Sequence, residues 1–112
     1  MKLVYVAGPF RAATPWGVEL NIRHAEALAL EVCRLGAVGV CPHTMWRHFD
    51  KSLPDEFWLA AGLHLLDRCD AVVLGEGWRA SRGTLREIER ACLLGLHVFE
   101  TLSELALWLG DA

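Results

Sequence analysis

The residues best suited to chemistry in this sequence form the pattern Ser81-x-Gly83-Thr84-x-x-Glu87. They follow a short apolar run that ends at Leu74 and a loop broken by glycines, and serine is a preferred residue at the start of a helix. Small and hydroxyl side chains near the positive end of a helix favour an anion. The stretch therefore predicts a strand, a loop and a helix whose first turn can bind an anion.

Glu87 lies where a carboxylate is least expected on that helix. With about 100° per residue and Gly83 at zero, Glu87 falls at about 40°, inside an apolar arc from about 20° to 200°. That arc is filled by Leu94, Ala91, Thr84, Gly95, Ile88, Cys92 and Leu85. A carboxylate that faces a sheet has a raised pKa unless a partner satisfies it. Glu87 is therefore either a functional acid or an edge residue that pairs with Arg86 or Arg90.

The chain around this stretch alternates short apolar runs with helical patterns. The predicted strands are 2–7, 37–41, 70–74 and 96–99, and a helix is predicted after each of them. The order βαβαβαβα with right-handed crossovers predicts an α/β fold, a three-layer sandwich of the flavodoxin-like or Rossmann-like kind. In such a fold, helices cover both faces of an open parallel sheet. At 112 residues the chain is expected to form one domain, 1–112.

Local signals set the expected helix boundaries. Gly17 argues against a regular helix before Asn21, so the segment 10–20 is expected to be a loop or the loose start of a helix. Capping patterns at 52–55 and 101–104 mark the starts of two further helices. The first of these helices is expected to bury an apolar stripe of Phe57, Trp58, Ala61, Leu65 and Cys69. The segment 42–53 has no apolar period and is expected to be a loop.

The expected sheet order brings two unusual loops together. With the order 2-1-3-4, the ligand-binding crevice lies between the first and third strands, beyond their carboxyl ends. The loops that follow these strands are 8–11, with the sequence Gly-Pro-Phe-Arg, and 75–81. The crevice is therefore predicted to lie beside the start of the helix that carries Glu87.

Composition excludes several classes of function. Eleven Lys and Arg against 14 Asp and Glu give a net charge of −3 without a basic tract, which argues against binding a nucleic-acid polymer. No apolar run approaches the length of about 18 residues that a membrane span needs, and no signal peptide is expected. The scattered cysteines Cys33, Cys41, Cys69 and Cys92 are expected to be reduced core residues of a cytoplasmic protein.

Other chemistries have weaker support. His43 and His48 lie five residues apart with Asp50 nearby, but a metal site needs more ligands, so we expect neither a metal nor a cofactor. Glycine-rich dinucleotide and P-loop motifs are absent. Trp78 falls in a predicted loop close to Ser81 and either packs there or stacks on a base.

Several stretches together resemble the nucleoside 2-deoxyribosyltransferase superfamily. They are VYVAGPFRA at 4–12, the helix from Asn21, CPH at 41–43 and CDAVVLGEGWRASRGTLREIERACLLG at 69–95. The chain is most similar to the small bacterial and phage proteins of that superfamily that carry a GW-x-x-S-x-G-x-x-x-E signature. The resemblance covers nearly the whole chain, and the S-x-G-x-x-x-E element is its most specific part.

The resemblance implies roles for individual residues. Glu87 stands at the position of the nucleophile that attacks C1′ of the sugar. Ser81 stands where the branch that hydrolyses deoxynucleoside 5′-monophosphates contacts phosphate, and Gly8 and Arg11 match the Gly-x-x-Arg loop of that branch. Gly62 departs from the superfamily, which usually has an Asp there that helps hold the base or the sugar.

We therefore expect an N-glycosidase or deoxyribosyltransferase that acts on a (deoxy)nucleoside or a nucleoside 5′-monophosphate. The alternatives are a catalytically inactive nucleotide-binding module and a structural or partner-binding domain. Besides Glu87, the expected substrate-binding residues are Gly8, Pro9, Phe10, Arg11, His43, Gly77, Trp78, Ser81, Gly83 and Thr84. A mean hydropathy of +0.28 and five tryptophans predict a homodimer or higher oligomer, with 42–53 near its interface.

Overall fold

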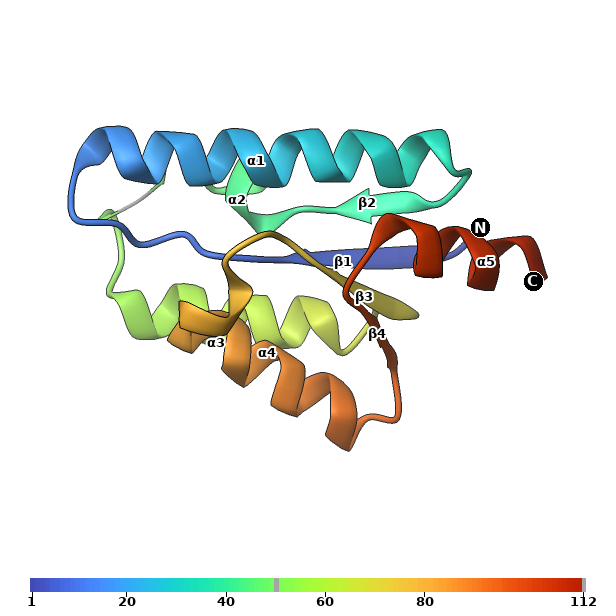
Figure 1. Ribbon diagram of the computed structural model, residues 1–112. Coiled ribbons are helices and arrows are strands. Elements are labelled where there is room, and N and C mark those ends of the chain that lie inside the picture. The colour runs from blue at the N-terminus through green and yellow to red at the C-terminus, as the bar shows by residue number, and fades with distance from the viewer. Residues whose placement is uncertain (50, 112) are drawn as a thin grey trace.

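A computed structural model of the chain describes residues 1–49 and 51–111 (Figure 1). Its strands are β1 (Leu3–Ala7), β2 (Val38–Val40), β3 (Ala71–Leu74) and β4 (His97–Phe99). Its α-helices are α1 (Pro15–Arg34), α2 (Pro42–Met45), α3 (Asp55–Leu66), α4 (Arg82–Leu93) and α5 (Leu102–Asp111). A single turn of 3₁₀-helix, η1 (Trp78–Ala80), precedes α4.

The strands form one parallel sheet in the order β2-β1-β3-β4, which confirms the predicted order. In the register, Tyr5 of β1 lies between Val40 of β2 and Val72 of β3. Asp70, predicted to open the third strand, lies just before it, and its carboxylate accepts a hydrogen bond of 2.8 Å from the backbone N–H of Leu3. The sheet order therefore reverses between β1 and β3, as the crevice argument requires.

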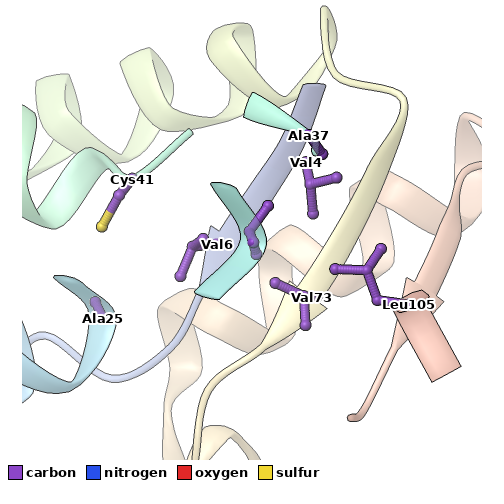
Figure 2. Close-up of a cluster of buried hydrophobic side chains, with 8 residues drawn as sticks. Val4, Val6, Ala25, Ala37, Cys41, Val73 and Leu105 are labelled. Atoms are coloured by element: carbon purple, nitrogen blue, oxygen red, sulfur yellow. The ribbon is translucent and has the colours of Figure 1, made fainter. Parts of the chain in front are cut away.

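Helices cover both faces of the sheet (Figure 1). On one face, Val4 and Val6 of β1 and Val73 of β3 pack against α1 and α5 (Figure 2). On the other face, Tyr5 and Ala7 of β1 pack against α3 and α4. Successive residues of a strand point to opposite faces, so both faces of β1 are apolar and buried. The predicted three-layer α/β sandwich is confirmed.

Helix α1 begins at Pro15, so the regular helix starts earlier than Asn21, where it was predicted to start, and part of the segment 10–20 is helical. Thr14 caps this helix, because its hydroxyl oxygen accepts a hydrogen bond of 3.0 Å from the backbone N–H of Gly17. A Cβ on Gly17 would lie 2.7 Å from that of Ala12. The glycine that suggested an irregular segment is thus present because the preceding loop folds back closely onto the first turn.

The capping pattern predicted at 52–55 is not formed. Helix α3 begins at Asp55 with Pro54 as its N-cap, and no side chain bonds to that end. The Ser52 hydroxyl instead donates to the backbone carbonyl of Phe49. Serine readily makes such local bonds to the backbone, and here this bond competes with capping.

The stripe predicted for α3 is formed in part, because Trp58, Ala61 and Leu65 are partly buried and Cys69, just after the helix, is buried. Gly62 and Leu66 are the buried residues of the helix, whereas Phe57, the first residue of the stripe, is 49% exposed. Leu59 and Leu63 are partly buried on the same side as Gly62. The side of α3 that carries Gly62 therefore faces the sheet, and Gly62 lies close to the side chain of Tyr5.

Helix α4 buries a narrower stripe than predicted. Thr84 and Ala91 are buried as expected, but Leu85 and Leu94 are each 43% exposed, and Cys92 is exposed too. A helix packed on one side of a sheet buries a stripe of only about 100°, so the outer parts of the predicted arc face solvent.

The cysteine prediction holds for only two of the four residues. Cys41 and Cys69 are buried, whereas Cys33 and Cys92 are exposed, and all four are free thiols. The exposed pair lies on α1 and α4, each of which has one buried and one solvent-facing side. An apolar sequence neighbourhood therefore does not suffice to place a helical cysteine in the core.

Two further predictions concern the segment 42–53 and the capping pattern at 101–104. The segment 42–53, predicted to be a loop, starts with the short helix α2. At 101–104, Thr101 caps the start of α5 as predicted, because its hydroxyl oxygen accepts a hydrogen bond of 3.2 Å from the backbone N–H of Glu104. The Thr101 hydroxyl in turn donates to the Glu104 carboxylate at 3.0 Å. Within residues 1–49 and 51–111, none of the helices has the length and apolar character needed to cross a bilayer.

Candidate functional site

A cavity of about 860 Å³ lies beyond the carboxyl ends of β1 and β3. Its walls come from the loop 8–11 after β1, from α2, from the first half of α3, and from 80–87 at the start of α4. This volume is in the usual range for pockets that bind small molecules. The structure thus places a cavity at the crevice that the sheet order predicts.

The two glycine loops meet at this cavity as predicted. A Cβ on Gly8 would lie 3.6 Å from the Cα of Gly75, so the two backbones pass each other closely. Gly77 has a φ of +82°, which favours glycine, and a Cβ there would lie 3.4 Å from Cγ of Pro9. The glycines therefore allow the loops after β1 and β3 to pack against each other and form one edge of the site.

Glu87 and Tyr5 form a polar pair at the base of the cavity, which both residues line. Tyr5 projects from β1 toward α3 and α4, and its hydroxyl donates a hydrogen bond to Oε2 of Glu87. Tyr5 is almost completely buried, and Glu87 is partly buried. The predicted inward orientation of Glu87 is confirmed, and Tyr5 is its partner.

The surroundings of the pair change both pKa values. Burial raises the pKa of Glu87 to about 7, and the hydrogen bond from Tyr5 opposes this rise because it stabilises the carboxylate. Burial, together with the nearby Glu87 charge, raises the pKa of Tyr5 well above its ordinary value. Tyr5 therefore stays protonated as a donor, while Glu87 changes its charge close to neutral pH.

The alternative in which Glu87 pairs with Arg90 is not formed. Nε and Nη2 of Arg90 donate to the two carboxylate oxygens of Asp67, each at 2.7 Å. Arg86, the other predicted partner, is exposed and lines the cavity. Glu87 is therefore held by the hydroxyl of a core tyrosine, which leaves its charge uncompensated by Arg90.

Ser81 caps α4 as predicted. Its side-chain oxygen accepts from the backbone N–H of Thr84 at 3.2 Å and from the Thr84 hydroxyl at 2.8 Å. Ser81 and Gly83 line the cavity, whereas Thr84 is buried beneath them and supports Ser81. The first turn of α4 thus presents a serine and a glycine to the cavity at the positive end of the helix.

Arg11 lines the cavity from the loop after β1. Its guanidinium forms an exposed ion pair with Asp55, and its Cζ lies 5.3 Å from the ring centroid of Phe10. Exposed ion pairs contribute little free energy, about 0–1 kcal/mol. An anion in the cavity can therefore compete with Asp55 for Arg11.

His43 has a structural position in the site. Its Nε2–H donates to the backbone carbonyl of Pro9 at 2.9 Å, and burial lowers its pKa, so the ring is neutral at pH 7. Its ring packs edge-on against Phe10, with centroids 5.5 Å apart. Asn21 donates to the carbonyl of Phe10 at 3.0 Å. These contacts fix the loop after β1 against the cavity.

The predicted absence of a metal site stays a prediction. Among the described residues, no three His, Cys, Asp or Glu side chains are grouped so as to hold an ion. His43 is hydrogen-bonded to a backbone carbonyl, and Asp50, the neighbouring candidate ligand in the sequence, lies outside the described residues.

The aromatic wall of the cavity comes from residues other than Trp78. Trp78 packs against the core on the α3 and α4 face, with Cζ of Arg79 4.4 Å from its ring centroid, and it does not line the cavity. Trp46, Trp58 and Phe10 line it instead, and the two tryptophan centroids lie 5.4 Å apart. Sequence reasoning missed Trp58, because it assigned this side chain to the buried stripe of α3.

Gly62 lies opposite the Glu87 carboxylate. A Cβ at this position would lie 3.1 Å from the Tyr5 hydroxyl oxygen and 3.8 Å from Oε2 of Glu87. Position 62 therefore directly adjoins the pair formed by Tyr5 and Glu87. Tyr5 itself could have been found from the sequence, since a tyrosine inside a strand buried on both faces needs a partner for its hydroxyl.

Residues 2–101 match the family described as "Domain of unknown function (DUF7768)", so the chain belongs to this family. A comparison with curated proteins found no match.

Proposed function

We propose that the protein cleaves the N-glycosidic bond of a (deoxy)nucleoside or nucleoside 5′-monophosphate, with Glu87 as the nucleophile. The sugar then passes either to water or to a second base. The observation that carries the proposal is the Glu87 carboxylate, which lines an 860 Å³ cavity and accepts a hydrogen bond from buried Tyr5. The resemblance of the S-x-G-x-x-x-E element to nucleoside 2-deoxyribosyltransferases supports the same role for Glu87.

The reaction follows from the properties of a carboxylate placed against the sugar. Oε1 of Glu87 forms a bond to C1′ while the C1′–N bond breaks, and the bonding electron pair leaves with the base, which takes a proton from solvent. In hydrolysis, water then attacks C1′, loses a proton and releases the sugar and the Glu87 carboxylate. In transfer, a nitrogen of a second base attacks C1′ in place of water. Tyr5 holds Oε2 in position throughout.

The other end of the substrate is expected at the start of α4. Ser81 and Gly83 line the cavity there, and Arg11 reaches it from the loop after β1. A phosphate binds well at a helix N-terminus with an arginine nearby. Phe10, Trp46 and Trp58 supply apolar surface for the base in the same cavity.

The proposal is tested by incubating the protein with a panel of nucleosides and 5′-monophosphates of every common base. Chromatography that detects free base measures cleavage, and a second added base reveals transfer. Release of base at a rate proportional to protein concentration supports the proposal. A panel without release of any base contradicts it, and a thermal shift with a nucleotide but no turnover assigns the cavity to binding alone.

If Arg11 and Ser81 hold a phosphate, a 5′-monophosphate should raise the melting temperature more than the matching nucleoside does. A ligand at a hundredfold excess over its Kd adds about 2.7 kcal/mol, or roughly 10 °C for a domain of this size. Arg11→Gln should remove most of the difference between nucleotide and nucleoside. Arg34→Gln, a change at an exposed site at the end of α1, is the matched control. If nucleotide and nucleoside raise the melting temperature of the unmodified protein equally, the proposed phosphate site is contradicted.

We also propose that the protein forms a homodimer or higher oligomer through the apolar surface around 45–57. Met45, Phe49, Leu53 and Phe57 are 44–50% exposed there. Phe49 and Phe57 each pack against Trp58, with centroids 6.2 and 5.0 Å apart. A patch of exposed aromatic and aliphatic side chains on a small domain marks an interaction surface.

Light scattering at micromolar concentration should therefore give at least twice the mass of one chain. The double substitution of Phe49 and Phe57 by serine should shift the protein to a monomer. Leu107→Ser, which changes a 73% exposed leucine on α5, is the control and should leave the mass unchanged. A monomer in the unmodified protein contradicts this proposal.

The compartment that we propose is the cytoplasm. All four cysteines are free thiols, and Cys33 and Cys92 are exposed to solvent. Exposed free thiols are typical of proteins kept in a reducing compartment.

A further inference from the structure

The start of helix α3 places carboxylates beside the aromatic wall of the cavity. Asp55, Glu56 and Trp58 all line the cavity and lie within one turn of the helix. Asp55 forms an ion pair with Arg11, whereas Glu56 is exposed and forms no ion pair within the described part of the chain. A negative charge next to an aromatic ring suits a cation, because the face of the ring also attracts positive charge. This part of the cavity can therefore bind a positively charged group.

The start of helix α4 has the opposite charge. Arg82 and Arg86 line the cavity there, and neither forms an ion pair with a described residue. They lie about one turn apart at the positive end of the helix, and such an arrangement of like charges lowers stability unless an anion compensates it. The phosphate of the substrate is expected on this side. The cavity thus has a negative, aromatic part on α3 and a positive part on α4.

Apart from the nucleophile itself, the described residues that line the cavity offer no proton to a departing base at neutral pH. The ring of His43 is neutral, and its Nε2–H is already donated to the carbonyl of Pro9. Burial keeps the pKa of Tyr5 well above its ordinary value. Asp55 and Glu56 are exposed, and exposed carboxyl groups are ionised at this pH, while arginine does not release its proton. A base that must be protonated as it leaves therefore has to take its proton from solvent.

The charge of the base decides whether that proton is needed. A neutral base keeps the electron pair of the broken C1′–N bond and becomes an anion unless it gains a proton. A base that is attached through a quaternary ring nitrogen carries a positive charge before cleavage, and the same electron pair neutralises it. Such a base leaves as a neutral molecule without any proton donor.

We propose that the substrate is a nucleoside 5′-monophosphate with a cationic base, such as a pyridinium ring, which lies against Trp58 and Glu56 while the phosphate lies at the start of α4. This inference rests on the proposed function and names its base. Oε1 of Glu87 bonds to C1′ as the C1′–N bond breaks, and both electrons of that bond stay on the ring nitrogen, which becomes neutral. Water then attacks C1′ and loses a proton, which releases the sugar phosphate and restores the Glu87 carboxylate.

The test compares nicotinamide mononucleotide, whose pyridinium base is cationic, with its 1,4-dihydro form and with adenosine 5′-monophosphate, whose bases are neutral. Chromatography measures the release of each base. We expect kcat/KM for the cationic nucleotide to exceed that for each neutral one by at least about a hundredfold, which is the usual contribution of a general acid.

Glu56→Gln gives a measure that is specific to this protein, because a cationic base leaves more easily from any site. The substitution should lower kcat/KM for nicotinamide mononucleotide by about tenfold and that for the dihydro form by less than about threefold, since only the cation loses an attraction. Glu89→Gln, on the exposed side of α4, is the matched control and should change neither value. An equal loss for both nucleotides in Glu56→Gln overturns the recognition of charge at this position.

Calorimetry with Glu87→Gln, which is expected to bind these nucleotides without cleaving them, separates binding from turnover. Nicotinamide mononucleotide should bind at least about fivefold more tightly than its dihydro form, and adding Glu56→Gln should reduce the difference to less than about twofold. Equal binding of the two forms, or a kcat/KM for a neutral base as high as that for the cationic one, overturns the cationic base and leaves the proposed function in place. Absence of base release from every nucleotide overturns the proposed function, and this inference with it.

Discussion

Glu87→Gln is expected to lower kcat by at least about a thousandfold while the protein stays folded. Glutamine keeps the shape of the side chain, and its carbonyl oxygen can still accept the hydrogen bond from Tyr5. The substitution removes the negative charge and the nucleophilic oxygen that capture the sugar at C1′. Water then has to attack without a covalent intermediate.

The same substitution should change how stability depends on pH. Burial raises the pKa of Glu87 from 4.5 to about 7, so the folded protein binds this proton more tightly than the unfolded chain does. This contribution to stability is fully present below about pH 4.5 and is lost as the pH rises through about 7. It amounts to on the order of 3 kcal/mol. Glutamine does not titrate, so the melting temperature of Glu87→Gln relative to the unmodified protein should rise between pH 5 and pH 8.

Release of base and thermal unfolding should be measured on the same preparations. Glu89→Gln, on the exposed side of the same helix, is the matched control and should leave both properties nearly unchanged. If Glu87→Gln turns over within tenfold of the unmodified protein, Glu87 is not the nucleophile. A lower melting temperature at every pH would instead assign Glu87 a structural role.

The sheet could be predicted because its signals are local. The apolar strand runs and the glycines that end them, such as Gly8 and Gly75, depend only on neighbouring residues. The rule of right-handed crossovers then limits the possible strand orders. The position of the crevice followed from the same rules, without any knowledge of a side-chain contact.

Helix boundaries and faces were less predictable because tertiary contacts determine them. The low helix propensity of Gly17 argues against a regular helix there, yet Gly17 lies in the first turn of α1, where Ala12 folds back against it. Phe57 belongs by its spacing to the apolar stripe of α3, but it packs against Trp58 at the surface. Neither contact can be recognised from the spacing of apolar residues.

Helical periodicity was enough to predict that Glu87 lies on the inner face of α4, because the position of a residue along a helix determines the direction of its side chain. Its partner could not be assigned in this way. Tyr5 and Glu87 are separated by 82 positions in the chain and meet only because β1 lies at the centre of the sheet. The sequence identifies Gly62 as a departure from the superfamily pattern. Its position next to Tyr5 and Glu87 can be recognised only from the fold.

Tyr5→Phe is expected to lower kcat/KM at pH 7 by about tenfold to a hundredfold and to move the pH profile to higher pH. The Tyr5 hydroxyl donates to Oε2 and so stabilises the ionised form of Glu87 against burial. Without this hydrogen bond, the pKa of Glu87 should rise above its value of about 7. A larger share of the protein then carries a protonated, non-nucleophilic Glu87 at neutral pH.

The profile of kcat/KM against pH distinguishes this role from a structural one. In the unmodified protein, activity should rise with pH through about 7, since kcat/KM follows ionisation of the free protein. In Tyr5→Phe, the rising limb should lie at higher pH, and much of the lost activity should return as the pH is raised. Phenylalanine fills the same space in the core, so the fold should persist. A loss by the same factor at every pH would show that Tyr5 aligns the carboxylate without setting its charge, and unchanged activity would remove Tyr5 from the site.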